Sequence, residues 1–162
     1  MARIFVGIGS NVDPANNIVK AVAALQQQFP DLRCSRVFES EAVGFVGDNF
    51  YNLVAEFSSP LTVVAISERL KQIELSLGRT IDGKKFSPRT VDIDLLLFDH
   101  LVTDTPVVLP RAEILFNAFV LWPLSELAPL LTHPVDGRSY AELWQSYDGS
   151  QQLWPIDLVL QK

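Results

Sequence analysis

The residues best suited to chemistry are two aspartates, Asp92 and Asp94, near the start of the apolar segment 91–98. Because side chains alternate between the faces of a strand, both carboxylates point to one side and the apolar side chains to the other. Two adjacent carboxylates repel each other unless a cation lies between them. Their hard oxygen atoms suit Mg²⁺, which proteins often hold with one or two carboxylates and the phosphates of a substrate. The pattern indicates a metal site, and a solvated strand edge is the alternative.

A cluster of positive charge comes immediately before these aspartates. It consists of Arg79, Lys84, Lys85 and Arg89. Cations beside a carboxylate pair can clamp phosphates, because catalysis of phosphoryl transfer rests mainly on positioning and electrostatic stabilisation. Phe86, in the same segment, has a ring that could stack on a base. A solvated loop that serves only solubility is the alternative interpretation.

Other residues carry weaker signals. Residues 7–11 lack the Gly-Lys-Ser/Thr ending of a P-loop and have too few glycines for a dinucleotide fingerprint, so they predict a tight turn. Asn52 and Glu74 are single polar residues in apolar surroundings, where a structural hydrogen bond is the more frequent explanation. Cys34 is expected to be packed rather than reactive. No role is assigned to the two histidines.

Composition limits the class of protein. The chain has 162 residues, 48% of them hydrophobic, which predicts one globular domain over residues 1–162. Its single cysteine excludes an internal disulfide framework and suits a reducing compartment. A formal net charge of -6 argues against non-specific binding to nucleic acid or to an anionic membrane. With no signal-peptide pattern and no apolar stretch of about 20 residues, we expect a cytoplasmic monomer without a membrane span.

Hydrophobic periodicity predicts the elements that position these residues. Strand patterns cover residues 4–8, 32–40, 50–58 and 91–98, and loops are expected at 41–49 and 79–90. One helix is expected from Asp13-Pro14 to Phe29, and a second opens at Ser59-Pro60 and ends at Gly78. The order βαββαβ is the signature of a ferredoxin-like α+β fold, with two helices on one face of an antiparallel sheet. The remaining third is expected to be an extension with a strand at 107–109, a helical turn at 118–122 and a helix near 140–144.

Taken together, the motifs make the sequence resemble the 6-hydroxymethyl-7,8-dihydropterin pyrophosphokinase family. The most specific match is Pro-Arg-Thr-Val-Asp-Ile-Asp-Leu-Leu-Leu-Phe at 88–98. It is joined in the family's order by Gly-Ser-Asn at 9–11, Phe-Tyr-Asn at 50–52, Ile-Glu at 73–74, Gly-Arg at 78–79 and Phe-Val-Leu-Trp-Pro-Leu at 119–124. The resemblance implies transfer of the terminal diphosphate of ATP to the hydroxymethyl oxygen of the reduced pterin, with release of AMP.

The resemblance also implies residue roles for ATP and metal. Asp92 and Asp94 would hold two Mg²⁺ ions that bridge the ATP phosphates. Arg79 and Arg89 would stabilise charge on the transferring group. The ATP-binding set would comprise Arg79, Lys85, Phe86, Arg89 and Arg111.

For the pterin, the resemblance implies a slot between two rings. Asn52 would hydrogen-bond the pterin edge, and Phe50 and Phe119 would sandwich its ring. The backbone around Val43 and Gly44 would supply further polar contacts.

The chain departs from the family pattern at a few positions. Arg111 stands where a histidine is usual, and Asn117 where an arginine is usual. Asn117 cannot replace the fork of an arginine on a phosphate oxygen. A divergent paralogue that binds pterin with weak or no transfer is therefore the alternative to an active enzyme.

Overall fold

A computed structural model describes residues 1–41, 49–78 and 90–160 of the chain. Within these residues, six strands form one antiparallel sheet. Five of them follow the order β5-β1-β4-β3-β6, and the sixth, the short strand β2, pairs with β4. The strands are β1 (Ala2–Ser10), β2 (Arg33–Cys34), β3 (Val37–Ser40), β4 (Phe50–Ser59), β5 (Asp92–Phe98) and β6 (Leu153–Ile156).

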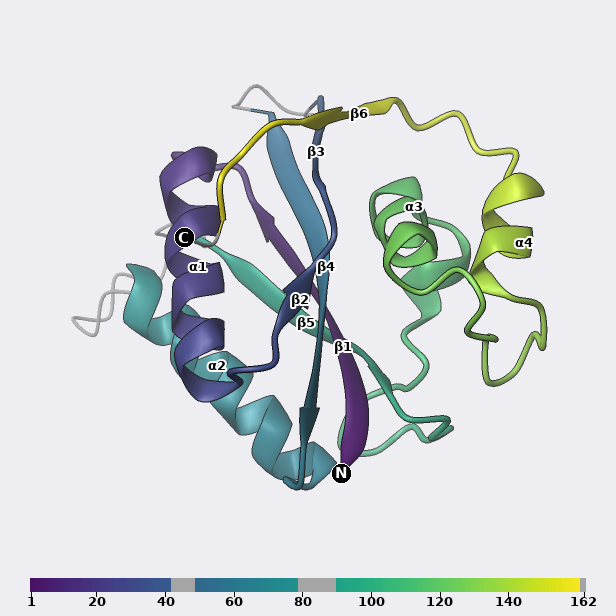
Figure 1. Cartoon of the computed structure of the whole chain (residues 1–162), viewed down its shortest axis with the longest axis horizontal. Helices are drawn as coiled ribbons and strands as arrows, with labels where there is room; N and C mark the ends of the chain where they lie inside the picture. The colour runs from purple at the N-terminus through teal and green to yellow at the C-terminus, as the bar shows by residue number, and fades with distance from the viewer. Residues whose placement is uncertain (42–48, 79–89, 161–162) are drawn as a thin grey trace.

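Helices cover both faces of this sheet (Figure 1). The helices α1 (Pro14–Gln28) and α2 (Val63–Gly78) lie on one face, and α3 (Ala118–Leu127) and α4 (Tyr140–Gln145) lie on the other. A short 3-10 helix, η1 (Ala112–Leu115), precedes α3. After α4 the chain returns to the sheet, where β6 pairs with β3.

The predicted ferredoxin-like α+β fold is confirmed. The order β1, α1, β2 with β3, β4, α2, β5 is the βαββαβ unit, and every strand pair is antiparallel. The apolar stripes of α1 and α2 are buried against the sheet, as their spacing predicts. The second helical layer comes from the predicted extension, where the expected helix near 140–144 is α4, and β6 was not predicted.

The single strand predicted over residues 32–40 is not continuous in the structure. The structure divides it into β2 and β3, with Ser35 between them. The hydroxyl of Ser35 accepts the backbone N–H of Val54 at 3.0 Å, and the N–H of Ser35 donates to the carbonyl of Val54 at 2.8 Å. Because a side chain takes part of the ladder, the regular pairing is interrupted at this point.

Two predicted boundaries also shift. The second helix begins at Val63 rather than at Ser59, because Ser59 completes β4 and the hydroxyl of Thr62 accepts the N–H of Ala65 at 3.2 Å. The predicted tight turn at residues 7–11 is wrong for Gly7, Gly9 and Ser10, which lie in β1. They are held there because β4 and β5 pair with β1 on both sides.

The C-terminal third differs most from expectation. Residues 107–109 form no strand; only Thr103 and Leu109 pair, through two 2.9 Å hydrogen bonds. The prolines at 106 and 110 lack the N–H groups that a longer ladder needs. The predicted helical turn at 118–122 is the first half of α3, which continues to Leu127.

A buried ionic cluster lies on β4 four residues from Asn52, and hence on the same face of the strand. Glu56 is 8% exposed and pairs with Arg3 and Arg33. Burial acts to raise the pKa of Glu56, but hydrogen bonds and charge from the two arginines outweigh it and hold the pKa below its ordinary value. This cluster provides a carboxylate whose charge is balanced within the protein.

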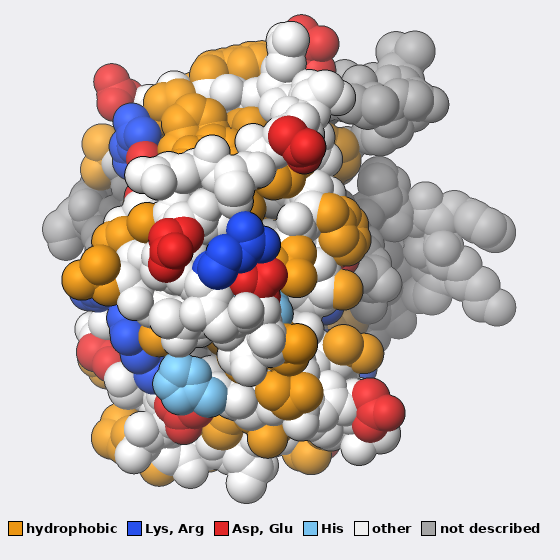
Figure 2. Space-filling view, turned by 90° about the vertical axis from the view of Figure 1, so that its right-hand side faces the viewer, with side chains coloured by type: hydrophobic (Ala, Val, Ile, Leu, Met, Phe, Trp, Pro, Cys, Tyr) orange, Lys and Arg blue, Asp and Glu red, His pale blue; other side chains and the backbone are white. Residues whose placement is uncertain are grey.

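The outer face over α3 and α4 carries charges of both signs among hydrophobic and polar atoms (Figure 2). Among the described residues, no helix combines the length and apolar character that crossing a bilayer requires. Cys34 is half-buried, and burial raises the pKa of its thiol to about 11, so the thiol stays protonated at neutral pH.

Candidate active site

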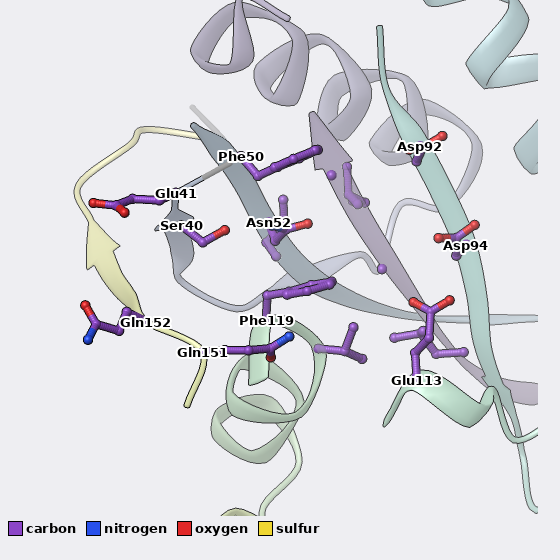
Figure 3. Close-up of a pocket in the computed structure, with 16 residues that line it drawn as sticks. Ser40, Glu41, Phe50, Asn52, Asp92, Asp94, Glu113, Phe119, Gln151 and Gln152 are labelled. Atoms are coloured by element: carbon purple, nitrogen blue, oxygen red, sulfur yellow. The ribbon is translucent and has the colours of Figure 1, made fainter. Parts of the chain in front are cut away.

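A pocket of about 480 Å³ opens where the ends of β1, β4 and β5 face the start of α3 (Figure 3). Five residues proposed from the sequence line it: Phe50, Asn52, Asp92, Asp94 and Phe119. The other lining residues are Gly7, Ile8, Gly9, Ser40, Glu41, Leu53, Leu96, Glu113, Val120, Gln151 and Gln152. The fold therefore brings together segments that are up to 145 residues apart in the sequence, from Gly7 to Gln152.

Asp92 and Asp94 lie on one side of β5, as the strand alternation predicts, and both are half-buried. Their neighbours on β1 are glycines: Gly9 pairs with Asp92, and Gly7 pairs with Asp94. With no β1 side chain opposite either aspartate, the floor of the pocket stays open on that side. The glycines predicted to form a turn therefore make room within the sheet.

The strand that carries the aspartates is held from its free edge. The carboxylate of Glu74, on α2, accepts the backbone N–H of Ile93 at 2.9 Å. Ile93 lies between the two aspartates, and its side chain points into the core. The sequence did not decide whether Glu74 has a structural role or a role in the site. In the structure, Glu74 fixes the backbone from which both carboxylates project.

An aromatic slot with one amide forms the other half of the pocket. Figure 3 shows the rings of Phe50 and Phe119 on opposite sides of Asn52, with the amide of Asn52 between them. A methyl group at Gly9 would come within 2.6 Å of the Oδ1 atom of Asn52. Glycine at this position therefore allows the amide to lie across the neighbouring strand.

Arg111 does not line the pocket itself but contacts two acidic residues that do, Asp94 and Glu113. Its Nη2 atom lies 3.6 Å from Oδ1 of Asp94 and 3.3 Å from Oε1 of Glu113. Its Nε atom is buried and has no hydrogen-bond partner among the described residues. A buried donor without a partner is costly, and an oxygen acceptor would satisfy it.

The remaining residues proposed for the site lie outside the described part of the chain. They are Val43, Gly44, Arg79, Lys85, Phe86 and Arg89. The two described residues on either side of 79–89 are in contact, since a methyl group at Gly78 would overlap the hydroxyl of Thr90. The hydroxyl of Ser10 donates to the carbonyl of Thr90 at 2.5 Å, which ties the start of β5 to the end of β1.

Comparison with known proteins places the pocket in a family. The model of the 7,8-dihydro-6-hydroxymethylpterin-pyrophosphokinase family matches residues 5–129. The chain belongs to this family. The match contains all five residues proposed from the sequence that line the pocket.

Curated relatives named 2-amino-4-hydroxy-6-hydroxymethyldihydropteridine pyrophosphokinase agree with this assignment. The protein of Aquifex aeolicus is 33% identical over 138 residues, which are 83% of this chain and 86% of that protein. The protein of Pseudomonas aeruginosa is 33% identical over 158 residues, which are 93% of this chain and 96% of that protein.

Among solved structures, the wild-type HPPK-DHPS of Plasmodium falciparum with SDX-DHP superposes with a TM-score of 0.66 at 11% identity. The likeness covers 90% of this chain but 43% of that one, so this chain spans less than half of its length. This structural likeness supports the fold of the pyrophosphokinase family.

The donor set of the pocket fits magnesium that arrives with a phosphate ligand. In the described part of the chain, no group of three or more His, Cys, Asp or Glu side chains could hold a metal ion. Asp92 and Asp94 offer two carboxylates, and Mg²⁺ is commonly held by one or two carboxylates together with substrate phosphates. The site thus suits an ion shared with a nucleotide better than a permanent metal centre.

Sequence reasoning missed several residues that line the pocket. Glu113 follows Arg111 by two positions in η1, and this local acidic-basic pair is a signal that could have been used. Ser40 and Glu41 adjoin a segment that was expected to be a loop. Gln151 and Gln152 come from a tail in which no motif was found, so only the folded chain places them beside α3.

Proposed function

We propose that the pocket uses ATP and Mg²⁺ to transfer a diphosphate group to the hydroxymethyl oxygen of 6-hydroxymethyl-7,8-dihydropterin, with release of AMP. The pyrophosphokinase activity of the family in folate biosynthesis extends to this chain. One observation carries the detailed proposal: the aromatic slot with its amide and the two aspartates open into the same pocket. This geometry supports binding a flat heterocycle beside a metal-bound phosphate chain.

In this proposal, Asp92 and Asp94 hold two Mg²⁺ ions. Bound Mg²⁺ would neutralise charge on the phosphate oxygens and lower the barrier to attack by the hydroxyl. The aspartates keep a fixed spacing because Glu74 holds the N–H of Ile93 between them. Gly7 and Gly9 leave the space that a phosphate group beside these carboxylates requires.

The pterin would lie in the slot between Phe50 and Phe119. Two rings on opposite sides of a flat heterocycle bury its faces, and Asn52 offers both a donor and an acceptor to its polar edge. Binding there would point the hydroxymethyl group toward Asp92 and Asp94. We assign further polar contacts to the backbone at Val43 and Gly44 on the resemblance alone.

For ATP, we assign a cation next to the pocket, Arg111, which contacts the lining residues Asp94 and Glu113. Its Nε atom is buried and without a partner in the described residues, which supports a hydrogen bond to a phosphate oxygen. We further assign Lys85 and Phe86 to ATP binding, and Arg79 and Arg89 to charge stabilisation during transfer, from the resemblance. Neither the comparisons nor the pocket favours the alternative of a pterin-binding paralogue without transfer.

We also propose that residues 1–162 act as one domain, and that the protein is a cytoplasmic monomer. The acidic composition and the single cysteine support these assignments. Size-exclusion chromatography with light scattering would measure the oligomeric state.

The decisive experiment measures AMP formed from ATP and Mg²⁺ with and without 6-hydroxymethyl-7,8-dihydropterin. We expect AMP that depends on the pterin and is lost in the Asp92→Ala variant. If the folded wild-type protein binds pterin but forms no AMP, the proposal of transfer is overturned in favour of the binding paralogue. Omission of Mg²⁺, with EDTA present, should abolish the reaction as completely as the substitution.

A further inference from the structure

Gln151 lies in the segment between α4 and β6 and reaches the pocket from a part of the chain beyond the family match. Its Oε1 atom accepts the backbone N–H of Ala118 at 2.5 Å. Its Nε2 atom donates to Oδ1 of Asn117 at 3.2 Å. Both contacts fix the same orientation of the amide, because the N–H of Ala118 needs an oxygen acceptor.

These contacts supply a partner for the first N–H group of α3. Asn117 occupies the N-cap position of the helix, yet its side chain makes no capping hydrogen bond. The first N–H groups of a helix lack partners within the helix, and Asn is normally a favoured side chain for supplying one. Gln151, 33 residues away in the sequence, provides an acceptor for the first of these groups, the N–H of Ala118. The start of α3 thus depends on the C-terminal segment.

Gln151 is itself held in place by Tyr147. The hydroxyl of Tyr147 lies 3.2 Å from Oε1 of Gln151 and donates to the carbonyl of Phe116 at 2.9 Å. Its ring stacks on Trp144 of α4, at 5.5 Å between centroids, and Trp144 stacks on Trp122 of α3 at 5.1 Å. The segment that carries Gln151 is therefore anchored to α3 through rings as well as hydrogen bonds.

The next residue after Ala118 is Phe119, whose ring forms one side of the aromatic slot (Figure 3). We propose that Gln151 is a positioning residue, which sets the affinity for pterin by fixing the start of α3 and hence the ring of Phe119. This inference rests on the proposed function, since it assigns the slot to the pterin. It extends the substrate site to a tail segment that lies outside the family match.

The test compares variants by direct binding of pterin and by the Michaelis constants for both substrates. Gln151→Ala removes the acceptor of the Ala118 N–H, and we expect the dissociation constant for pterin to rise about five- to tenfold. The Michaelis constant for ATP should stay close to wild type, and the melting temperature should fall by only a few degrees. Tyr147→Phe keeps the ring but removes the hydroxyl that contacts Gln151, and should raise the dissociation constant for pterin about twofold.

Two further variants separate positioning from other roles. Gln151→Glu keeps the acceptor, and a rotated Asn117 amide can donate to the new carboxylate, so its pterin affinity should return to within about twofold of wild type. Gln145→Ala is the matched control, because it makes the same change at an exposed residue of α4 that does not line the pocket. It should bind pterin like the wild type.

The outcomes are distinguishable from a failure of the proposed function. If the wild type binds pterin and Gln151→Ala binds it equally well, the positioning role is overturned while the proposed function stands. An equal loss of affinity for pterin and ATP, or a loss that Gln151→Glu does not restore, also overturns it. A wild-type protein that binds no pterin overturns the proposed function and this inference with it.

Discussion

The carboxylate of Glu56 and those of Asp92 and Asp94 lie on one sheet but differ in burial and in their neighbours. Glu56, on β4, is buried and paired with Arg3 and Arg33. Asp92 and Asp94, on β5, are half-buried and face an open pocket. The cation nearest to Asp94 in the described residues is Arg111, at 3.6 Å, beyond the usual length of a hydrogen bond. Glu56 is paired with two cations of the sheet, whereas Asp92 and Asp94 face a pocket that a ligand can enter.

The difference shows how the same chemical group serves stability in one place and binding in another. At Glu56 the two arginines outweigh the effect of burial and lower the pKa, so the carboxylate favours the folded state when ionised. At the pocket, glycines instead of side chains lie beside the aspartates on β1. Substitutions in the two groups should therefore affect different measurements.

The largest expected effect is on catalysis. Asp94→Asn removes one of the two charged ligands for Mg²⁺, and we expect the rate of AMP formation to fall about a thousandfold or more. Thermal unfolding should be unchanged, because Asp94 is not part of the buried core. Asp104→Asn makes the same chemical change at an exposed site and should keep full activity. Activity in Asp94→Asn above a tenth of wild type would contradict the metal assignment.

The reverse pattern is expected at the buried group. Glu56→Gln leaves two arginines without their partner, and the free energy of unfolding should fall by about 2 kcal/mol, less than for a fully buried pair because both arginines are partly exposed. Urea denaturation measures this change. The rate of AMP formation at 25 °C should stay within about twofold of wild type. Glu68→Gln, on the exposed side of α2, is the control and should leave stability unchanged.

Arg111 lies at the boundary between the two behaviours, because it contacts acidic side chains and also has a buried Nε atom with no partner in the described residues. Arg111→Ala should raise the Michaelis constant for ATP about tenfold, the cost of one charge-assisted hydrogen bond. Arg111→Lys keeps the charge but loses the Nε donor, and should recover part of this affinity. An unchanged constant in Arg111→Ala would assign Arg111 to local structure alone.

The parts of the site predicted from the sequence are those set by local periodicity. Strand alternation alone placed Asp92 and Asp94 on one side of β5, and the spacing of apolar residues located α1 and α2. The slot of Phe50, Asn52 and Phe119 required more, since it joins residues from β4 and α3. Only the resemblance to a family indicated it before the structure did.

The parts that sequence missed depend on contacts between distant segments. Glycine is a local signal for a turn, so Gly7 and Gly9 predicted one. In the structure they lie in β1, opposite the aspartates of β5. Gln151 carries no local signal, since its partner, the N–H of Ala118, is a backbone group 33 residues away. β6 contains a proline and pairs only at the sheet edge, which makes its pattern weak.

The smallest expected effect concerns a buried histidine of the C-terminal third. His133 is buried, and its Nδ1 atom accepts the N–H groups of Val135 and Asp136 at 3.1 and 3.0 Å. Burial lowers its pKa, and the charge of Asp136 only partly opposes this, so the folded state favours the neutral ring.

A lowered pKa fixes the sign of the pH dependence. The stability gained from neutral His133 is present above the ordinary histidine pKa of about 6.5 and is lost as the pH falls through the folded value. His133→Asn keeps an acceptor for the two N–H groups but does not titrate. The stability of wild type relative to this variant should therefore decrease from pH 7.5 to pH 5, by less than the effect of Glu56→Gln. Urea denaturation at both pH values measures it, and a difference that grows on acidification would show that ionised His133 gains a partner in the fold.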